Sequence, residues 1–103
     1  MSLDITITRK RDVFCPHCGE PIELREVAEE RSGGRVWYPF LEKVGYYGEN
    51  SPWYGEDMVL TREQSDRLYR FCKNEQPYNH YAIMRMVAMA QAEGQAVVIN
   101  ADW

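Results

Sequence analysis

The feature that most constrains the fold of this chain is a predicted helix at residues 80–93 that is apolar on almost every side. Asn79 precedes it as a capping residue, and Gly94 follows it as a typical C-terminal residue. Its apolar side chains surround the helix: Ile83, Met84, Met86, Val87, Met89 and Ala90. Such a helix is expected either at the centre of the domain or beneath a second subunit, which would make a homodimer through 80–93.

A second helix is predicted just before it. Thr61 and Gln64 have the spacing of a capping box, so the helix should run from Arg62 to about Asn74. One of its faces is apolar: Leu68, Phe71 and Cys72. The helical pair therefore spans 61–93.

Strands are predicted at both ends of the chain. Residues 3–8 alternate between apolar and polar side chains, and the apolar run at 96–100 suits an interior final strand. Residues 25–35 are charged and end in two glycines, which predicts a loop. The order of elements predicts an α+β fold in one small domain, 1–103. It would have an N-terminal β-hairpin with a Cys-x-x-Cys knuckle, two C-terminal helices and a final short strand.

The region 36–60 is dense in aromatic residues, and Gly48, Asn50 and Gly55 favour a loop around a short helix at 39–44. Its candidate partner-binding residues are Trp37, Tyr38, Tyr46, Tyr47, Trp53 and Tyr54. Alternatively, about half of them pack as core, because a small domain must bury what apolar area it has. The region holds one lysine and four acidic residues, so a protein or peptide partner is expected rather than nucleic acid.

The motif Cys15-Pro16-His17-Cys18-Gly19 places two thiols on one tight turn, a spacing that suits Zn²⁺. The segment 13–24 resembles half of a zinc ribbon, a family in which such a knuckle lies at the tip of a β-hairpin. A zinc ribbon has a second Cys-x-x-Cys knuckle, which this chain lacks.

The remaining metal ligands would have to come from the helical pair, where Cys72 and His80 are the candidates. With Cys15 and Cys18 they would form a closed, structural Cys₃His site. Three other interpretations stay open. Cys72 can be a core residue, His80 can be a first-turn polar residue, and the knuckle can keep its shape without metal.

These features predict a small, non-enzymatic zinc-binding interaction module. The net charge of −4 argues against bulk binding of nucleic acid, and no triad, phosphate loop or dinucleotide fingerprint is present. No apolar run approaches the ~20 residues of a membrane span, and no signal peptide is visible, so a cytoplasmic protein is expected.

Two alternative functions remain. One is a nucleic-acid-associated small zinc-ribbon protein that contacts phosphates through Arg9, Lys10 and Arg11. The other is a thiol-disulfide oxidoreductase, because Cys15-Pro16-His17-Cys18 also resembles the active-site motif of DsbA-like enzymes. In those enzymes the first thiolate lies at a helix N-terminus, whereas Gly19 and Pro21 would break such a helix here.

Overall fold

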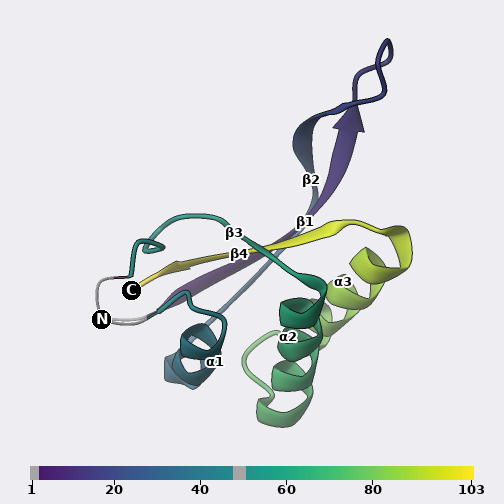
Figure 1. Ribbon diagram of the computed structural model, residues 1–103. Coiled ribbons are helices and arrows are strands. Elements are labelled where there is room, and N and C mark those ends of the chain that lie inside the picture. The colour runs from purple at the N-terminus through teal and green to yellow at the C-terminus, as the bar shows by residue number, and fades with distance from the viewer. Residues whose placement is uncertain (1–2, 48–50) are drawn as a thin grey trace.

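A four-stranded antiparallel sheet organises the protein in the computed structural model, which describes residues 3–47 and 51–103. The strand order is β2-β1-β4-β3 (Figure 1). The strands are β1 (Asp4–Phe14), β2 (Pro21–Gly33), β3 (Met58–Leu60) and β4 (Ala96–Asp102). The helical elements are the 3-10 turn η1 (Arg35–Trp37), α1 (Tyr38–Lys43), α2 (Arg62–Glu75) and α3 (His80–Glu93). The predicted α+β class is confirmed, with its hairpin, helical pair and final strand.

In the described parts of the chain, the helices cover one face of the sheet (Figure 1). Strand periodicity explains why, since alternate residues point to opposite faces. On β1, Ile5 and Ile7 are buried against the helices, whereas Thr6 points to the opposite face. The helices complete this core with buried residues of α2 and α3: Leu68, Cys72, Ile83, Met86, Val87 and Ala90.

The prediction of a loop at 25–35 was wrong for most of its length. β2 continues to Gly33, paired with β1 from Asp4 opposite Gly33 to Phe14 opposite Pro21. Its charged side chains lie on an exposed strand, so no buried face imposes an apolar alternation on the sequence. The strand β3 within 36–60 was also missed, and β4 extends to Asp102.

Helix α3 has the predicted bounds but is not buried all round. Ile83 and Val87 face the core, whereas Tyr81 is 75% exposed and Met89 is 45% exposed. The sheet has helices on one face, so α3 lies at the surface of a two-layer structure rather than between layers. Asn79 holds the predicted cap position, but its side chain makes no capping hydrogen bond. Thr61 and Gln64 do form the predicted capping box.

The aromatic region is partly helical, as predicted, because α1 begins near Pro39 and ends before Val44. The predicted loop residues Gly48 and Asn50 lie outside the described residues. No helix within 3–47 and 51–103 is long and apolar enough to span a membrane.

Candidate functional site

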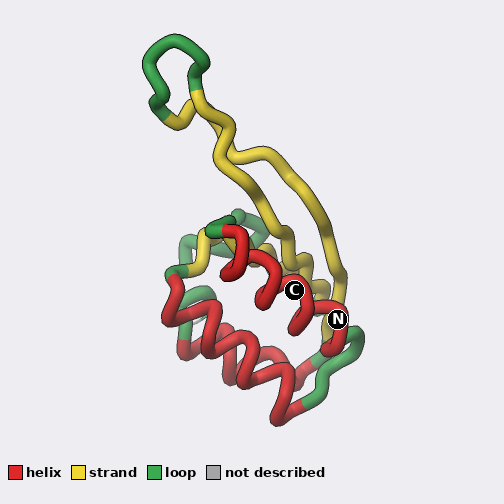
Figure 2. The backbone as a smooth tube through the Cα atoms, turned by 90° about the vertical axis from the view of Figure 1, so that its right-hand side faces the viewer, coloured by secondary structure: helices red, strands yellow, loops and turns green. Residues whose placement is uncertain are grey.

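The Cys-x-x-Cys turn lies at the end of a two-stranded arm. The pairing of β4 with β1 stops at Lys10, opposite Ala96, whereas β1 and β2 stay paired up to Phe14 and Pro21. Residues 11–25 therefore leave the sheet as a hairpin, which we name the hairpin arm. Figure 2 shows the hairpin arm extending away from the helices, with the turn at its far end.

Backbone hydrogen bonds close this turn. The N–H of Cys15 donates to the carbonyl of Glu20 at 2.8 Å, and the N–H of Gly19 donates to the carbonyl of Cys15 at 2.9 Å. Gly19 has φ +74°, a left-handed conformation that L-residues with a side chain rarely adopt. The turn thus brings the two cysteines together, as the resemblance to a zinc-ribbon knuckle implied.

The turn stabilises a thiolate at Cys15. Hydrogen bonds from the backbone N–H groups of Cys18 and His17, together with the Cys18 thiol, lower the pKa of Cys15 below its ordinary value. Cys18 is exposed and Cys15 is partly exposed. The thiolate is the form of cysteine that binds metal, so the turn presents two solvent-accessible sulfur atoms of a type that suits a metal ion.

The other two predicted ligands are not brought to this turn. Cys72 is fully buried in the core on α2, and burial raises the pKa of its thiol to about 12. His80 begins α3, where its Nδ1 lies 3.0 Å from the carbonyl oxygen of Pro77. Among residues 3–47 and 51–103, no three His, Cys, Asp or Glu side chains are grouped to hold a metal ion. The structure therefore does not assemble the predicted intramolecular Cys₃His site.

This difference has a simple physical cause. Cys72 shares the apolar face of α2 with Leu68, and that face packs under the sheet. The hairpin arm extends in another direction from the same sheet (Figure 1). The interpretation of Cys72 as a core residue is the one that its burial supports.

The predicted aromatic surface is largely interior. Trp37 and Tyr46 have no exposed area, so neither can present its ring to a partner. Tyr38, Tyr47 and Trp53 are partly buried against the core. Tyr54 is 50% exposed, but its hydroxyl donates a hydrogen bond to Asp102 and its ring makes an edge-to-face contact with Trp103. Trp37 packs against Phe71 of α2, whereas Tyr46, Tyr47 and Tyr54 contact Trp103 at the end of β4.

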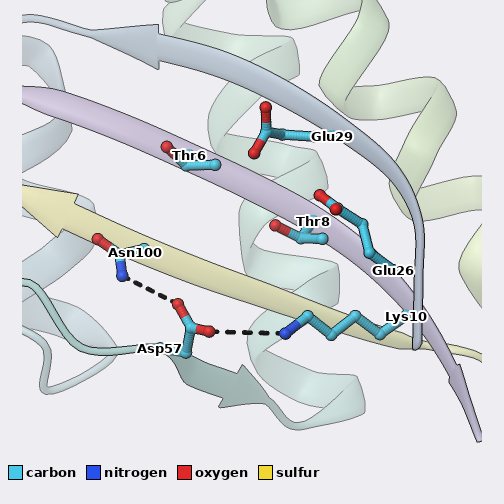
Figure 3. Close-up of a pocket in the computed structure, with 7 residues that line it drawn as sticks. All are labelled: Thr6, Thr8, Lys10, Glu26, Glu29, Asp57 and Asn100. Carbon is cyan, nitrogen blue, oxygen red and sulfur yellow. Dashed lines mark hydrogen bonds and ion pairs between the residues drawn. The ribbon is translucent and has the colours of Figure 1, made fainter. Parts of the chain in front are cut away.

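A polar hollow on the open face of the sheet was not predicted. It has a volume of about 380 Å³. Figure 3 shows its lining side chains: Thr6, Thr8, Lys10, Glu26, Glu29, Asp57 and Asn100. Asp57 is held by Lys10 at 3.5 Å and by the amide of Asn100 at 2.9 Å. The alternating pattern at 3–8 predicted that Thr6 and Thr8 share a polar face. Glu26 and Glu29 could not be placed beside them, because the sequence predicted a loop at 25–35 where the structure has a strand.

A second hollow, of about 570 Å³, lies between α1 and α2. Its apolar wall includes Phe40 and Phe71, and its cations are Lys43, Arg67 and Arg70. No sequence motif indicated it, because the two helices that line it are distant in the chain.

The chain matches no protein-family model, no curated protein and no solved structure.

Proposed function

We propose that this protein is a small zinc-binding interaction module and not an enzyme. The observation that carries the proposal is the closed turn at the tip of the hairpin arm, where Cys15 and Cys18 are adjacent and solvent-accessible. Two thiolates in one turn match the preference of Zn²⁺ for sulfur ligands. The reduced state of these thiols suits the cytoplasm, which is where we place the protein.

The interaction function follows from the incomplete ligand set. Zinc held by protein is almost always four-coordinate, and the described chain offers two ligands at the turn. The remaining positions must be filled by water or by groups from another molecule. Because the turn lies at the end of a projecting arm, a partner protein or peptide can reach it without displacing the core (Figure 2).

The nucleic-acid alternative has weak support from the basic residues that suggested it. The guanidinium of Arg9 donates to the Gln95 side chain at 3.1 Å, and Lys10 is paired with Asp57. Arg11 is exposed opposite Arg25 on the hairpin arm. Of these three basic residues, only Arg11 has no hydrogen-bond or ion-pair partner among the described residues, and a single cation is a poor phosphate-binding surface.

The lowered pKa of Cys15 would also suit a thiol-disulfide oxidoreductase, but the backbone around Cys15 differs from the helix N-terminus that DsbA-like enzymes use. After Cys18 the chain returns as β2 from Pro21, so in the described structure no helix N-terminus follows the first thiol. The N–H groups that stabilise Cys15 come from the turn itself. Such an arrangement suits a metal ligand as well as a nucleophile.

The proposal is tested by metal analysis of protein purified with a phosphine reductant. We expect bound zinc, and cobalt substitution should give the absorption of thiolate-to-metal charge transfer. Cys15→Ser and Cys18→Ser should each lower zinc affinity by at least about tenfold, whereas Cys72→Ala should retain the metal. A protein that binds neither zinc nor cobalt at micromolar concentration would contradict the proposal, and disulfide reduction that depends on Cys15 would favour the oxidoreductase.

A further inference from the structure

The turn offers two of the four ligands that a tetrahedral zinc site needs, and the same turn of a second copy would offer the other two. We infer, on the basis of the proposed zinc binding, that two copies of this chain join tip to tip around one zinc ion. Cys15 and Cys18 of each copy would provide the four sulfur ligands. A two-fold axis through the metal relates the copies, so one turn completes the other without any further residue.

The shape of the molecule permits this contact. The hairpin arm carries the turn beyond the edge where β4 ends its pairing at Lys10. Figures 1 and 2 show the turn as the outermost part of the arm, clear of α1, α2 and α3 in both views. Two arms can therefore meet end to end while their helical layers remain apart.

The formal charge of the hairpin arm is small. Within residues 11–25 the basic side chains are Arg11 and Arg25 and the acidic ones are Asp12, Glu20 and Glu23, so the arm has a net charge of −1. The whole chain has a net charge of −4, so the arm carries only a small part of the charge that would oppose self-association.

Exposed apolar side chains next to the turn form a surface that a second copy could bury. Phe14 is 55% exposed, Ile22 is 61% exposed and Leu24 is 41% exposed. Ile22 and Leu24 lie two residues apart on β2, and Phe14 pairs with Pro21 beside them. A free two-stranded ribbon has little core of its own, so burying these side chains between two copies would stabilise the arm.

The binding step is a proton-for-metal exchange and needs no oxidant. Each cysteine loses its S–H proton to solvent or buffer as its sulfur forms a bond to Zn²⁺. Four protons leave per metal ion, and the resulting tetrathiolate centre carries two negative charges. The backbone N–H groups of His17 and Cys18, which donate to the Cys15 sulfur, would also stabilise this charge.

The test is the mass and zinc content of the full chain in solution, measured by light scattering and metal analysis with a phosphine reductant present. We expect a dimer with about one zinc per two chains, which a chelator converts to monomer and added zinc restores. Cobalt-substituted protein should show the spectrum of a tetrathiolate site. Cys18→Ser should remain monomeric with zinc, and the matched Cys72→Ala should still dimerise.

The outcomes separate this inference from the proposed function. A monomer with one zinc per chain keeps the metal-binding function and overturns the tip-to-tip dimer. A dimer that persists in chelator also overturns it and favours contact through the exposed face of α3. Absence of zinc in the wild type contradicts both proposals. Circular dichroism of Cys18→Ser confirms folding, and Ile22→Thr with Leu24→Thr provides a second variant that keeps both thiols and should weaken zinc-linked dimerisation at least fivefold.

Discussion

The hydroxyl of Tyr46 accepts a hydrogen bond from the backbone N–H of Ala101 at 2.9 Å, inside the core. β3 pairs with β4 only as far as Met58 opposite Ile99, so Ala101 lies beyond the end of that strand. Beyond the end of β3 no described strand residue accepts the Ala101 N–H, and the Tyr46 hydroxyl accepts it instead. It also donates to the carbonyl of Glu56 at 2.6 Å, which ties the segment after α1 to the edge of the sheet.

Removing this hydroxyl should destabilise the fold. Tyr46→Phe keeps the ring and leaves the Ala101 N–H without a partner, so we expect the free energy of unfolding to fall by about 1–3 kcal/mol. Chemical denaturation followed by circular dichroism measures it. Tyr47→Phe is the matched control, because Tyr47 is partly buried beside it and makes no hydrogen bond through its hydroxyl among those that the structure shows. Equal effects of the two changes would contradict the role of Tyr46.

The three thiols should differ sharply in reactivity. Cys15 and Cys18 are accessible, and the pKa of Cys15 is lowered, whereas Cys72 is buried with a raised pKa. A thiol reagent added to reduced, metal-free protein should modify two sites quickly and the third only after unfolding. Peptide mass analysis identifies the sites. Fast labelling of Cys72 in the native protein would contradict its place in the core.

Local rules predicted the parts of the fold that depend on neighbouring residues. The Thr61–Gln64 capping box and the C-terminal Gly94 set the ends of their helices, and the glycine after Cys18 closes the turn. These features need only a few consecutive residues, so they can be identified without the tertiary structure. The closed Cys-x-x-Cys turn was predictable for the same reason.

The features that the sequence did not predict depend on tertiary contacts between elements that are distant in the chain. The charged part of β2 from residue 25 to residue 33 gave no strand signal, because most of its side chains are exposed and the pairing with β1 fixes its conformation. Cys72 and His80 lie on α2 and α3, and the hairpin arm extends away from these helices, so in the described part of the chain neither residue meets the two cysteines of the turn. The aromatic residues Trp37 and Tyr46 resembled a binding surface, and only their packing against the sheet shows them to be core.

Gly33 should tolerate no side chain. It pairs with Asp4, and a Cβ at this position would overlap the carbonyl oxygen of Leu3, which accepts the N–H of Gly34. Gly33→Ala should therefore lower the free energy of unfolding by about 1–3 kcal/mol, as overpacking does. Val27→Ala, at an exposed site on the same strand, should change it by less than about 0.5 kcal/mol. Similar thermal midpoints for both variants would disprove the steric argument.

Asn79 should behave as a link between α3 and β2 rather than as a helix cap. Its amide donates to Glu30 at 2.9 Å and to the carbonyl of Arg31 at 3.0 Å, and its φ of 65° is left-handed. Serine caps helices as well as asparagine does, yet Asn79→Ser should cost about 1–2 kcal/mol because both links are lost and because serine adopts the left-handed backbone less readily. Thr61→Ser, at the genuine cap, should cost less than about 0.5 kcal/mol. A small effect at Asn79 would restore the capping interpretation.

The buried thiol of Cys72 should make the fold sensitive to alkaline pH. Burial raises its pKa from 9.0 to about 12, so the folded state keeps the proton that the unfolded chain releases above pH 9.0. The stability that the protonated Cys72 thiol contributes to the folded state is therefore fully present below pH 9.0 and is lost as the pH rises toward 12. Relative to Cys72→Ala, the wild type should lose about 1.4 kcal/mol of its free energy of unfolding per pH unit within this range.

Urea denaturation of both proteins between pH 8 and about 10.5, with reductant present, measures the difference. Other titrating groups such as Tyr46 cancel because both proteins contain them. Parallel stability curves for the two proteins would show that Cys72 ionises as freely in the folded state as in the unfolded chain.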